Sequence, residues 1–342
     1  MFKRILVPLD GSTRAEQALP IAAHLAQASE GTILLLHVVN TTQEAMAYGF
    51  GGAFIPPGTI EDILLEGQTY LARLIQRTHL TGMAAVEKQV VSGNPSEKIL
   101  QVAQEQSVDL IVMASHGYTG FIQWLLGSVA EKVAHHAPAP VLIMREADPL
   151  HTHFHADGST VVRALVPLDL ATHEQDAIVP VAELVAALSS PGKGVLHLLQ
   201  MMVLPEEASV SERESLLREA SANLDTFGQQ TRETVREQLT PALQPKITWS
   251  ISVDSDIAEG IARVAEDGEE TPESGRIEHC DLIAMTTHSL KGVQKWVTGS
   301  ITDRVLHATR LPLLVVRPAD VIAREFHSKK TQAQTSVEAE KV

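Results

Sequence analysis

The chain has 342 residues, 44% of them hydrophobic, and a formal net charge of −15. This length is sufficient for two domains that each bury a core of their own. Binding to nucleic acid requires a basic surface that neutralises phosphates, so the acidic balance argues against that class of function. No apolar stretch approaches the roughly 20 residues that span a bilayer, so we expect no association with a membrane.

The N-terminal residues and the cysteine content indicate a cytoplasmic protein. Met1-Phe2-Lys3-Arg4 leads directly into a strand-like run, so no signal peptide is expected, and Cys280 is the only cysteine. A single cysteine cannot form an internal disulfide, which is compatible with a reducing compartment. We therefore expect the protein to be cytoplasmic.

Strand-like and helix-like runs alternate along the first half of the chain. Strands are predicted near residues 3–9, 32–39, 85–91, 109–114 and 140–145, where Val, Ile and Leu follow one another with little alternation. Helices are predicted over roughly 60–80, 95–106 and from Ser128 to about Ala137. An earlier helix should start near Ser12-Thr13, with Thr13 and Glu16 as a capping box and a bend or early break at Pro20. This alternation predicts an α/β fold with a parallel sheet.

The segment between the second strand and the second helix, Thr41–Thr59, combines glycines and prolines with large apolar side chains. The apolar residues are Met46, Tyr48, Phe50 and Phe54. One interpretation is a lid over a ligand or a docking surface for a protein partner. The other is an ordered loop that packs on its own domain, and the sequence leaves both interpretations open.

A loop rich in small residues lies between the fourth strand and the helix that begins at Ser128. It runs from Ala114 through His116 and Gly117 to Gly127-Ser128. Glycines allow the backbone to approach a ligand, and the N–H groups of a first helical turn point at an anion, so the loop is typical of a phosphate site. No Lys follows the last Gly, which excludes Walker A. An alternative role for Ser128 is to cap the helix together with Glu131.

The chain then repeats itself over about the length of a domain. His288, Gly292, Trp296, Gly299 and Ser300 correspond to His116, Gly120, Trp124, Gly127 and Ser128, each 172 positions later. Leu165–Asp169 corresponds to Leu6–Asp10 at an offset of 159, and Leu196-His197-Leu198 to Leu36-His37-Val38 at an offset of 160. We expect two copies of one domain, at 1–146 and 161–318, with a linker at 147–160 and a polar tail at 319–342.

The spacing of Gly117, nine residues and then Gly127-Ser128 resembles the nucleotide-binding signature of the universal stress protein family. Ala114 stands where the family pattern has its first glycine. The resemblance implies two tandem, doubly wound α/β domains with five-stranded parallel sheets in the order 3-2-1-4-5, similar to the adenine nucleotide alpha hydrolases. It also implies that the final strand, near Val141–Met144 and Leu313–Val316, pairs antiparallel with its copy in another domain. Because one chain holds two copies, we expect the two halves to pair with each other.

The resemblance further implies an adenine nucleotide, ATP either alone or with Mg²⁺, bound in the first half. The implied contacts are Pro8, Asp10, Ser12, Val38, Met113, Ala114, His116, Gly117, Gly127, Ser128 and Val129. Asp10 would accept bonds from the nucleoside, although an Asp at this place can also cap the first helix. Gly117 and Gly127 can alternatively serve as turn glycines only.

The second half retains less of this pattern. Gly11-Ser12 becomes Leu170-Ala171, Gly117 becomes Ser289 and Ala114 becomes Thr286. We expect this second site to be degraded and empty. The second half also contains Glu266–Glu278, whose acidic residues, glycines and proline predict a solvated loop.

The expected function is that of a nucleotide-binding sensor or regulator in the stress response. The alternatives are an interaction or scaffold protein of the same fold that binds no nucleotide, and a slow ATP hydrolase. The sequence shows no catalytic nucleophile with a partnered base and no cluster of metal ligands. His151, His153 and His155 alternate in the linker and are interpreted as solvated rather than as a metal site.

Overall fold

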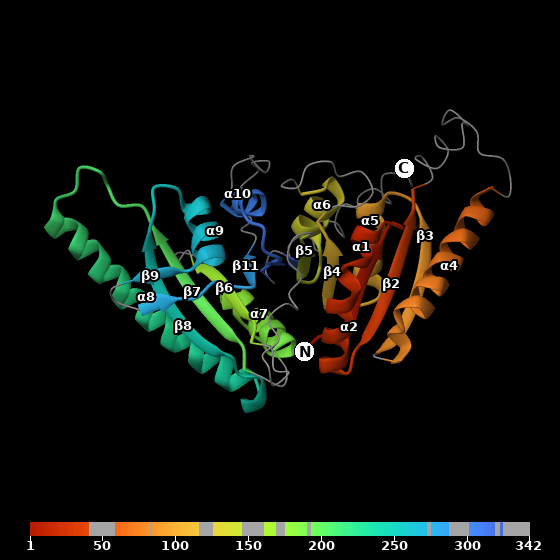
Figure 1. The fold of residues 1–342 in the computed structure, drawn as a ribbon, viewed down its shortest axis with the longest axis horizontal. Coiled ribbons are helices and arrows are strands. Elements are labelled where there is room, and N and C mark those ends of the chain that lie inside the picture. The colour runs from red at the N-terminus through yellow and green to blue at the C-terminus, as the bar shows by residue number, and fades with distance from the viewer. Residues whose placement is uncertain are drawn as a thin grey trace, which may run out of the picture.

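The computed structural model describes residues 1–40, 59–82, 84–115, 126–145, 161–168, 175–189, 193–271, 275–286, 301–318 and 322–323. Ten strands form one continuous sheet in the order β3-β2-β1-β4-β5-β12-β11-β6-β7-β8 (Figure 1). Each half contributes five neighbouring strands, and each half has the predicted order 3-2-1-4-5. Within each half, all pairings that belong to this sheet are parallel.

The first half follows the predicted alternation closely. Its strands are β1 (Arg4–Leu9), β2 (Thr32–Val39), β3 (Ala85–Ser92), β4 (Leu110–Ala114) and β5 (Val141–Met144). Its helices are α1 (Thr13–Glu16), α2 (Ala18–Ser29), α4 (Thr59–Thr78), α5 (Pro95–Glu105) and α6 (Ser128–His136), with a short 3₁₀ helix at Leu80–Gly82.

The second half repeats this order with longer connecting elements. Its sheet strands are β6 (Arg163–Leu168), β7 (Val195–Met202), β8 (Lys246–Val253), β11 (Leu282–Thr286) and β12 (Leu313–Val316). Its helices are α7 (Gln175–Leu188), α8 (Val210–Gln238), α9 (Ile257–Asp267) and α10 (Ile301–Ala308), with a 3₁₀ helix at Pro241–Leu243. A separate hairpin consists of β9 (Glu269–Thr271) and β10 (Gly275–Ile277).

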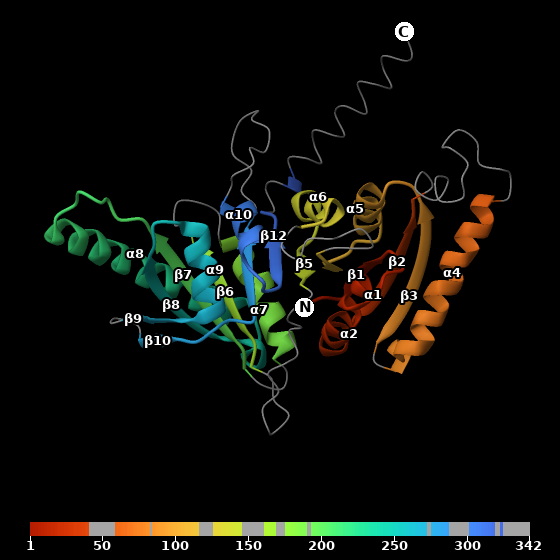
Figure 2. The same cartoon turned by 45° about the horizontal axis from the view of Figure 1, so that its top comes forward.

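The two halves meet at their last strands, as expected. β5 pairs antiparallel with β12, and Leu142 lies opposite Leu314. The turned view shows these two strands side by side at the centre of the molecule, with α4 and α8 at its opposite ends (Figure 2). Each strand is apolar and buried, so the pairing removes an edge that would otherwise be open to aggregation.

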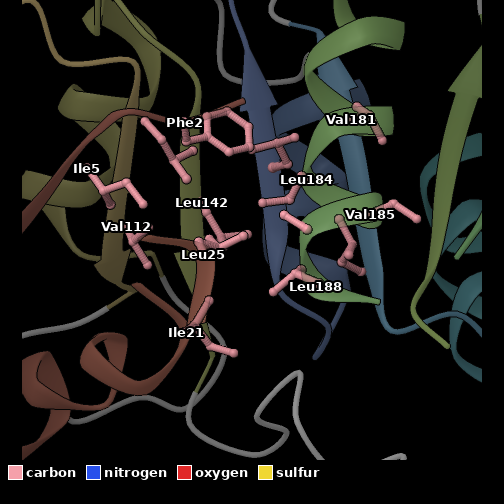
Figure 3. Close-up of a cluster of buried hydrophobic side chains, with 14 of the residues drawn as sticks. Phe2, Ile5, Ile21, Leu25, Val112, Leu142, Val181, Leu184, Val185 and Leu188 are labelled. Carbon is pink, nitrogen blue, oxygen red and sulfur yellow. The ribbon is translucent and has the colours of Figure 1, made fainter. Parts of the chain in front are cut away.

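Two cores cover the two faces of this sheet. One contains residues of α2, α4, α7 and α8, and the other contains residues of α5, α6, α9 and α10. The first core crosses the junction between the halves, where Leu184, Val185 and Leu188 of α7 face Leu25 and Leu142 of the first half (Figure 3). The halves therefore share a hydrophobic core as well as a sheet.

The beginning of the first helix differs from the prediction by one residue. Ser12, rather than Thr13, is the N-cap, and its side chain accepts a hydrogen bond from the Ala15 N–H. The helix ends at Glu16, and α2 begins at Ala18 with Pro20 in its first turn, so the predicted break is confirmed. Proline has no N–H to donate back to the preceding turn, which explains the interruption. Pro180, by contrast, lies inside the continuous helix α7.

The prediction of a solvated loop at Glu266–Glu278 is wrong about the loop: the end of α9 and two short strands lie here, although Asp267, Glu270 and Glu278 are exposed as expected. Gly268, at a φ of +73°, ends α9 and turns the chain into the β9–β10 hairpin. A side chain at this position would lie 2.4 Å from the Ile277 carbonyl oxygen, so the turn needs glycine. Ile277 is buried and anchors the hairpin, an apolar contact that the acidic composition conceals.

The strand register also corrects the matching of His197 to His37. Leu6 lies opposite Leu34 in the first half, whereas its counterpart Leu165 lies opposite His197. The structural counterpart of His197 is therefore Leu34. By the same register, Gln200 corresponds to His37 and Met201 to Val38. The Leu-His pair that both halves contain, which suggests an offset of 160, does not mark equivalent positions in the two sheets.

His197 is a buried histidine held between two hydroxyl groups. Its Nδ1 lies 2.8 Å from Thr248 Oγ1, and its Nε2 lies 2.9 Å from Ser250 Oγ. Burial lowers its pKa from 6.5 to about 4. The imidazole is therefore neutral in the folded protein at pH values where the unfolded chain already binds a proton.

We predict that this histidine makes the protein sensitive to acid. Because the unfolded state binds the proton first, His197 contributes stability fully above pH 6.5 and loses it as the pH falls toward 4. The loss amounts to about 3 kcal/mol at most. In His197→Leu, the free energy of unfolding should depend less on pH across this window, as measured by urea denaturation at several pH values. His79→Asn, which changes an exposed histidine, is the control, and an unchanged slope in His197→Leu would contradict the prediction.

Candidate functional site

The strand order reverses beside β1, which pairs with β2 on one side and with β4 on the other. In open α/β sheets, ligands bind beyond the carboxyl ends of the strands at such a reversal. The segments that follow these ends are Asp10–Ser12 after β1 and Ala114-Ser115 at the end of β4. The predicted contacts that the structure describes on β1 and β4 therefore lie at this edge on neighbouring strands.

The turn after β1 is held by a small hydrogen-bond network. The backbone N–H and the hydroxyl of Ser12 donate to Asp10 Oδ1 over 3.0 and 2.6 Å. The Ser12 oxygen in turn accepts from the Ala15 N–H over 3.1 Å. The alternative that Asp10 caps the first helix is therefore wrong: Ser12 is the cap, and Asp10 orients Ser12.

Gly11 gives this turn its shape. Its φ of +87° is a conformation that residues with a side chain rarely adopt. A Cβ at Gly11 would meet no described atom within 4 Å. The glycine is required by the backbone, and the described part of the chain leaves the space beside it open.

The first turn of α6 is the most informative part of the site. Gly127 is the N-cap, with no side-chain cap, and Ser128 is the first helical residue. The prediction that Ser128 caps the helix with Glu131 is therefore wrong. Counted from the N-cap Gly127, Glu131 is the fourth helical residue, whereas a capping box needs Glu at the third. The N–H groups of Ser128 and Val129 precede the first position that an intrahelical carbonyl can satisfy. They carry the positive end of the helix dipole.

The remaining described contacts form the edge of the sheet at this place. Met113 is buried in β4, and Pro8 is buried in β1. Val38 is half-buried near the end of β2, opposite Val91. Ala114 ends β4 opposite Met144 and is not among the residues with positive φ, so alanine creates no backbone strain where the family pattern has glycine. His116 and Gly117 lie outside the described residues.

Ser115 lies among these predicted contacts, although no sequence pattern singles it out. Its carbonyl accepts from the Gly127 N–H over 2.8 Å, and its own N–H donates to the Met144 carbonyl over 2.9 Å. The two ends of the loop that carries the glycine signature are therefore tied together, which fixes the start of α6 against the end of β4. The role is a backbone role and leaves no signature in residue type.

Little of the second crevice falls within the described residues. Thr286, the counterpart of Ala114, ends β11 and is buried, and its carbonyl accepts from Thr302 Oγ1 over 3.4 Å. The strand register places the larger Met201 where the first half has Val38. Asp169, Ser289, Gly299 and Ser300 lie outside the described residues, so the expectation of an empty second site stays a prediction.

Two further observations concern only the part of the chain that the structure describes. No group of three or more His, Cys, Asp or Glu side chains in that part could hold a metal ion. No helix there is both long and apolar enough to cross a membrane. Cys280 is buried, and its burial raises the pKa of the thiol to about 12.

Comparison with known proteins identifies the family. The sequence profile of the universal stress protein family matches residues 1–145 and again residues 163–317. The chain belongs to the universal stress protein family. The universal stress protein YxiE of Bacillus subtilis is 34% identical over 149 residues, which are 42% of this chain and all of YxiE. A universal stress protein from Thermus aquaticus is 32% identical over 146 residues, again 42% of this chain and all of that protein.

A solved structure matches both halves together. A universal stress protein from Archaeoglobus fulgidus has a TM-score of 0.59 over 93% of this chain and 97% of its own, at 20% sequence identity. This agreement supports the tandem arrangement at the level of the fold.

The uncapped start of α6 leads to a prediction about stability. Gly127 has φ −66° and ψ 145°, a conformation that any residue adopts. In Gly127→Asp, the carboxylate should cap α6 and complement its dipole, which raises the free energy of unfolding by about 0.5–1 kcal/mol. Ser128→Ala, at the first helical position, should change it by much less. Chemical denaturation measures both variants, and a destabilised Gly127→Asp would show that the helix start is already satisfied.

Proposed function

We propose that this universal stress protein binds an adenine nucleotide, ATP either alone or with Mg²⁺, in its first half and acts as a sensor or regulator in the stress response. The observation that carries the proposal is the first turn of α6. In the described part of the chain, the glycine N-cap leaves the N–H groups of this turn without a side-chain acceptor at the reversal of strand order, where an anionic group would satisfy them.

In this proposal the phosphates lie at the N-terminus of α6. The N–H groups of Ser128 and Val129 and the Ser128 hydroxyl donate to them, and Gly127 provides close approach of the backbone. His116 and Gly117 are the further contacts that the family resemblance implies in the preceding loop. The ligand would replace the side-chain cap that α6 lacks, so part of its binding energy would come from helix N–H groups.

The nucleoside lies between the ends of β1 and β2. Asp10 accepts from the ribose or base, with its orientation fixed by Ser12, while backbone groups at Val38 meet the adenine. Pro8, Met113 and Ala114 shape the edge of the sheet beneath it. Because Ser12 already donates two hydrogen bonds to Asp10 Oδ1, the carboxylate is oriented before any ligand arrives.

The hydrogen bonds between Ser12 and Asp10 favour nucleotide binding over nucleotide hydrolysis. Phosphoryl transfer to water needs a positioned base and a carboxylate that holds a metal ion. Asp10 is the only carboxylate that the sequence suggests for such a role, and one of its oxygens is engaged by Ser12. The second candidate function, a scaffold of the same fold without nucleotide, predicts no binding at all and is distinguished by the measurements below.

We predict one nucleotide per chain. The first half has Gly11, Ser12 and Gly117, where the second half has Leu170, Ala171 and Ser289. Calorimetric titration with ATP, in the presence and absence of Mg²⁺, should give a stoichiometry near one.

Gly117→Val should abolish binding because it fills the space that the phosphates need, whereas Ser289→Val should leave it unchanged. Gly127→Asp should weaken binding while it stabilises the fold, so that lost affinity cannot be attributed to unfolding. Two equivalent sites, or no heat with any adenine nucleotide, would contradict the proposal.

Residues 41–58 of the segment Thr41–Thr59 lie outside the described residues, Thr59 begins α4, and the segment's part in function is a proposal. It follows β2 directly and therefore begins at the rim of the proposed nucleoside site. We predict that hydrogen exchange across this segment slows when ATP is added and recovers when ATP is removed, because closure needs contacts that exist only with nucleotide bound. Exchange in α8 serves as the internal reference. Equal exchange at saturating ATP would leave the segment as packing on its own domain.

A further inference from the structure

Helix α4 lies at one end of the molecule, beside β3 (Figures 1 and 2). An open groove runs along one side of this helix. Its volume is about 960 Å³, and every described residue that lines it belongs to α4. Leu74 and Tyr70 lie at its base, and Leu65, 61% exposed, stands at its rim.

The residues that line the groove have a two-fold complementary pattern. They occupy positions equally spaced on either side of the point between Thr69 and Tyr70. Reflected through that point, they form the pairs Asp62 with Arg77, Leu65 with Leu74, Glu66 with Arg73, and Thr69 with Tyr70. Each acidic residue falls opposite a basic one, whereas Leu74, which is 1% exposed, belongs to the chain's own core and does not meet Leu65 of a second copy.

This pattern matches an antiparallel contact between two copies of α4. A two-fold axis brings residue i of one copy against residue j of the other, and j against i, so the surface must be complementary to itself. Asp62 and Arg77 are about 22 Å apart along the helix at 1.5 Å per residue, so the contact extends over roughly four turns. The order of charges specifies the antiparallel orientation, since parallel copies would set acid against acid.

The helix dipole does not account for the whole pattern. Acidic residues at the start of a helix and basic residues at its end are favoured by the dipole, but the effect is confined to the first and last turns. Asp62 and Arg77 lie in those turns. Glu66 and Arg73 lie in the interior of the helix, where the dipole gives no preference for this order.

The two interior charges are also uncommitted within the chain. In the part of the chain that the structure describes, Glu66 and Arg73 are exposed and form no ion pair. Arg77 does pair with Glu16, which also accepts a hydrogen bond from the Tyr70 hydroxyl over 3.1 Å. Arg77 nevertheless keeps 64% of its side chain exposed and can meet a second carboxylate.

We propose that this groove is the contact surface for a second copy of the chain, which docks its own α4 antiparallel across the two-fold axis. The ion pairs between copies join Glu66 to Arg73 and Asp62 to Arg77. This contact is separate from the β5–β12 pairing inside the chain and lies at the opposite edge of the first half's sheet. The proposal does not depend on nucleotide binding.

A charge-swap experiment tests the proposal. The full chain should sediment with a mass twice its 37.0 kDa as the concentration rises. A single helix pair is at the low end of interface sizes, so the series should extend to about 100 μM. Glu66→Arg and Arg73→Glu should each be monomeric, because each sets like charges opposite each other at two places. The double variant should dimerise again.

An equimolar mixture of the two single variants gives the sharpest result. The arginine introduced at position 66 of one chain then faces the glutamate introduced at position 73 of the other. The unchanged Arg73 and Glu66 of the same two chains also face each other, so a heterodimer should form from two monomeric proteins. The expected dimer in the mixture, but in neither single variant, would be difficult to obtain from any other surface. Failure of both the mixture and the double variant to dimerise would overturn the proposal.

Cross-linking locates the axis independently. Thr69→Cys places a thiol beside the two-fold axis, and oxidation should give a disulfide-linked dimer. Gln68→Cys, one residue away and exposed but outside the groove, should not cross-link. Cys280 is buried and does not interfere. A chain that stays monomeric at every concentration, with no cross-link through Thr69→Cys, would show that the groove receives something other than a second copy.

Discussion

The antiparallel pairing of β5 with β12 is the interaction on which the rest of the architecture depends. Each strand is four residues long, apolar and fully buried, so neither could remain as an open edge of a sheet. Their pairing converts two five-stranded sheets into one and allows α2 and α7 to share a core across the junction. The orientation of one half relative to the other follows from this single register.

A reciprocal pair of arginines completes the junction. Arg317, which follows β12, donates to the carbonyl of Ala137 at the end of α6 over 3.1 Å, and Arg145, which follows β5, donates to the carbonyl of Leu306 in the last turn of α10. Both guanidinium groups are buried. Burial lowers the pKa of Arg145 to about 10, so it remains charged at neutral pH. A cation at a helix C-terminus is favoured by the dipole, and each half thus caps a helix of the other.

This arrangement links the junction to the candidate site through α6. The N-terminus of α6 carries Gly127, Ser128 and Val129, and its C-terminus is held by the other half through Arg317. His135, also on α6, lies 3.4 Å from Asp303 on α10. His307 is the counterpart of His135, and Glu131 is the counterpart of Asp303. These two counterparts form no ion pair in the described part of the chain. The junction is therefore two-fold in its strands and arginines but not in these side chains.

Sequence patterns predict the large features of the fold and miss by one residue at the helix starts that matter most. Strand positions, strand order and the pairing of the halves follow from apolar runs and from the family resemblance, because buried strands leave a strong pattern. At both Thr13 and Ser128, however, a Ser or Thr three residues before Glu suggests a capping box. In both helices the true N-cap is one residue earlier, since cap geometry depends on backbone angles that residue type does not reveal. For Ser128 the difference changes the chemistry, because a capping serine would satisfy the N–H groups that Gly127 leaves available.

The divergence of the second half is consistent with its structural task. The first half needs β12 to pair with β5 and Arg317 to cap the end of α6, and neither contact involves a nucleotide. The rest of the second half differs more from the first: α8 extends over 29 residues from a Ser209–Glu212 capping box, a hairpin follows α9, and Met201 stands where the register of the first half has Val38. A half that supplies an edge strand and a helix cap from within the same chain keeps α6 in place at any protein concentration, whereas a partner on another chain would do so only when bound. The junction therefore constrains β12 and Arg317 whether or not the second half binds a ligand of its own.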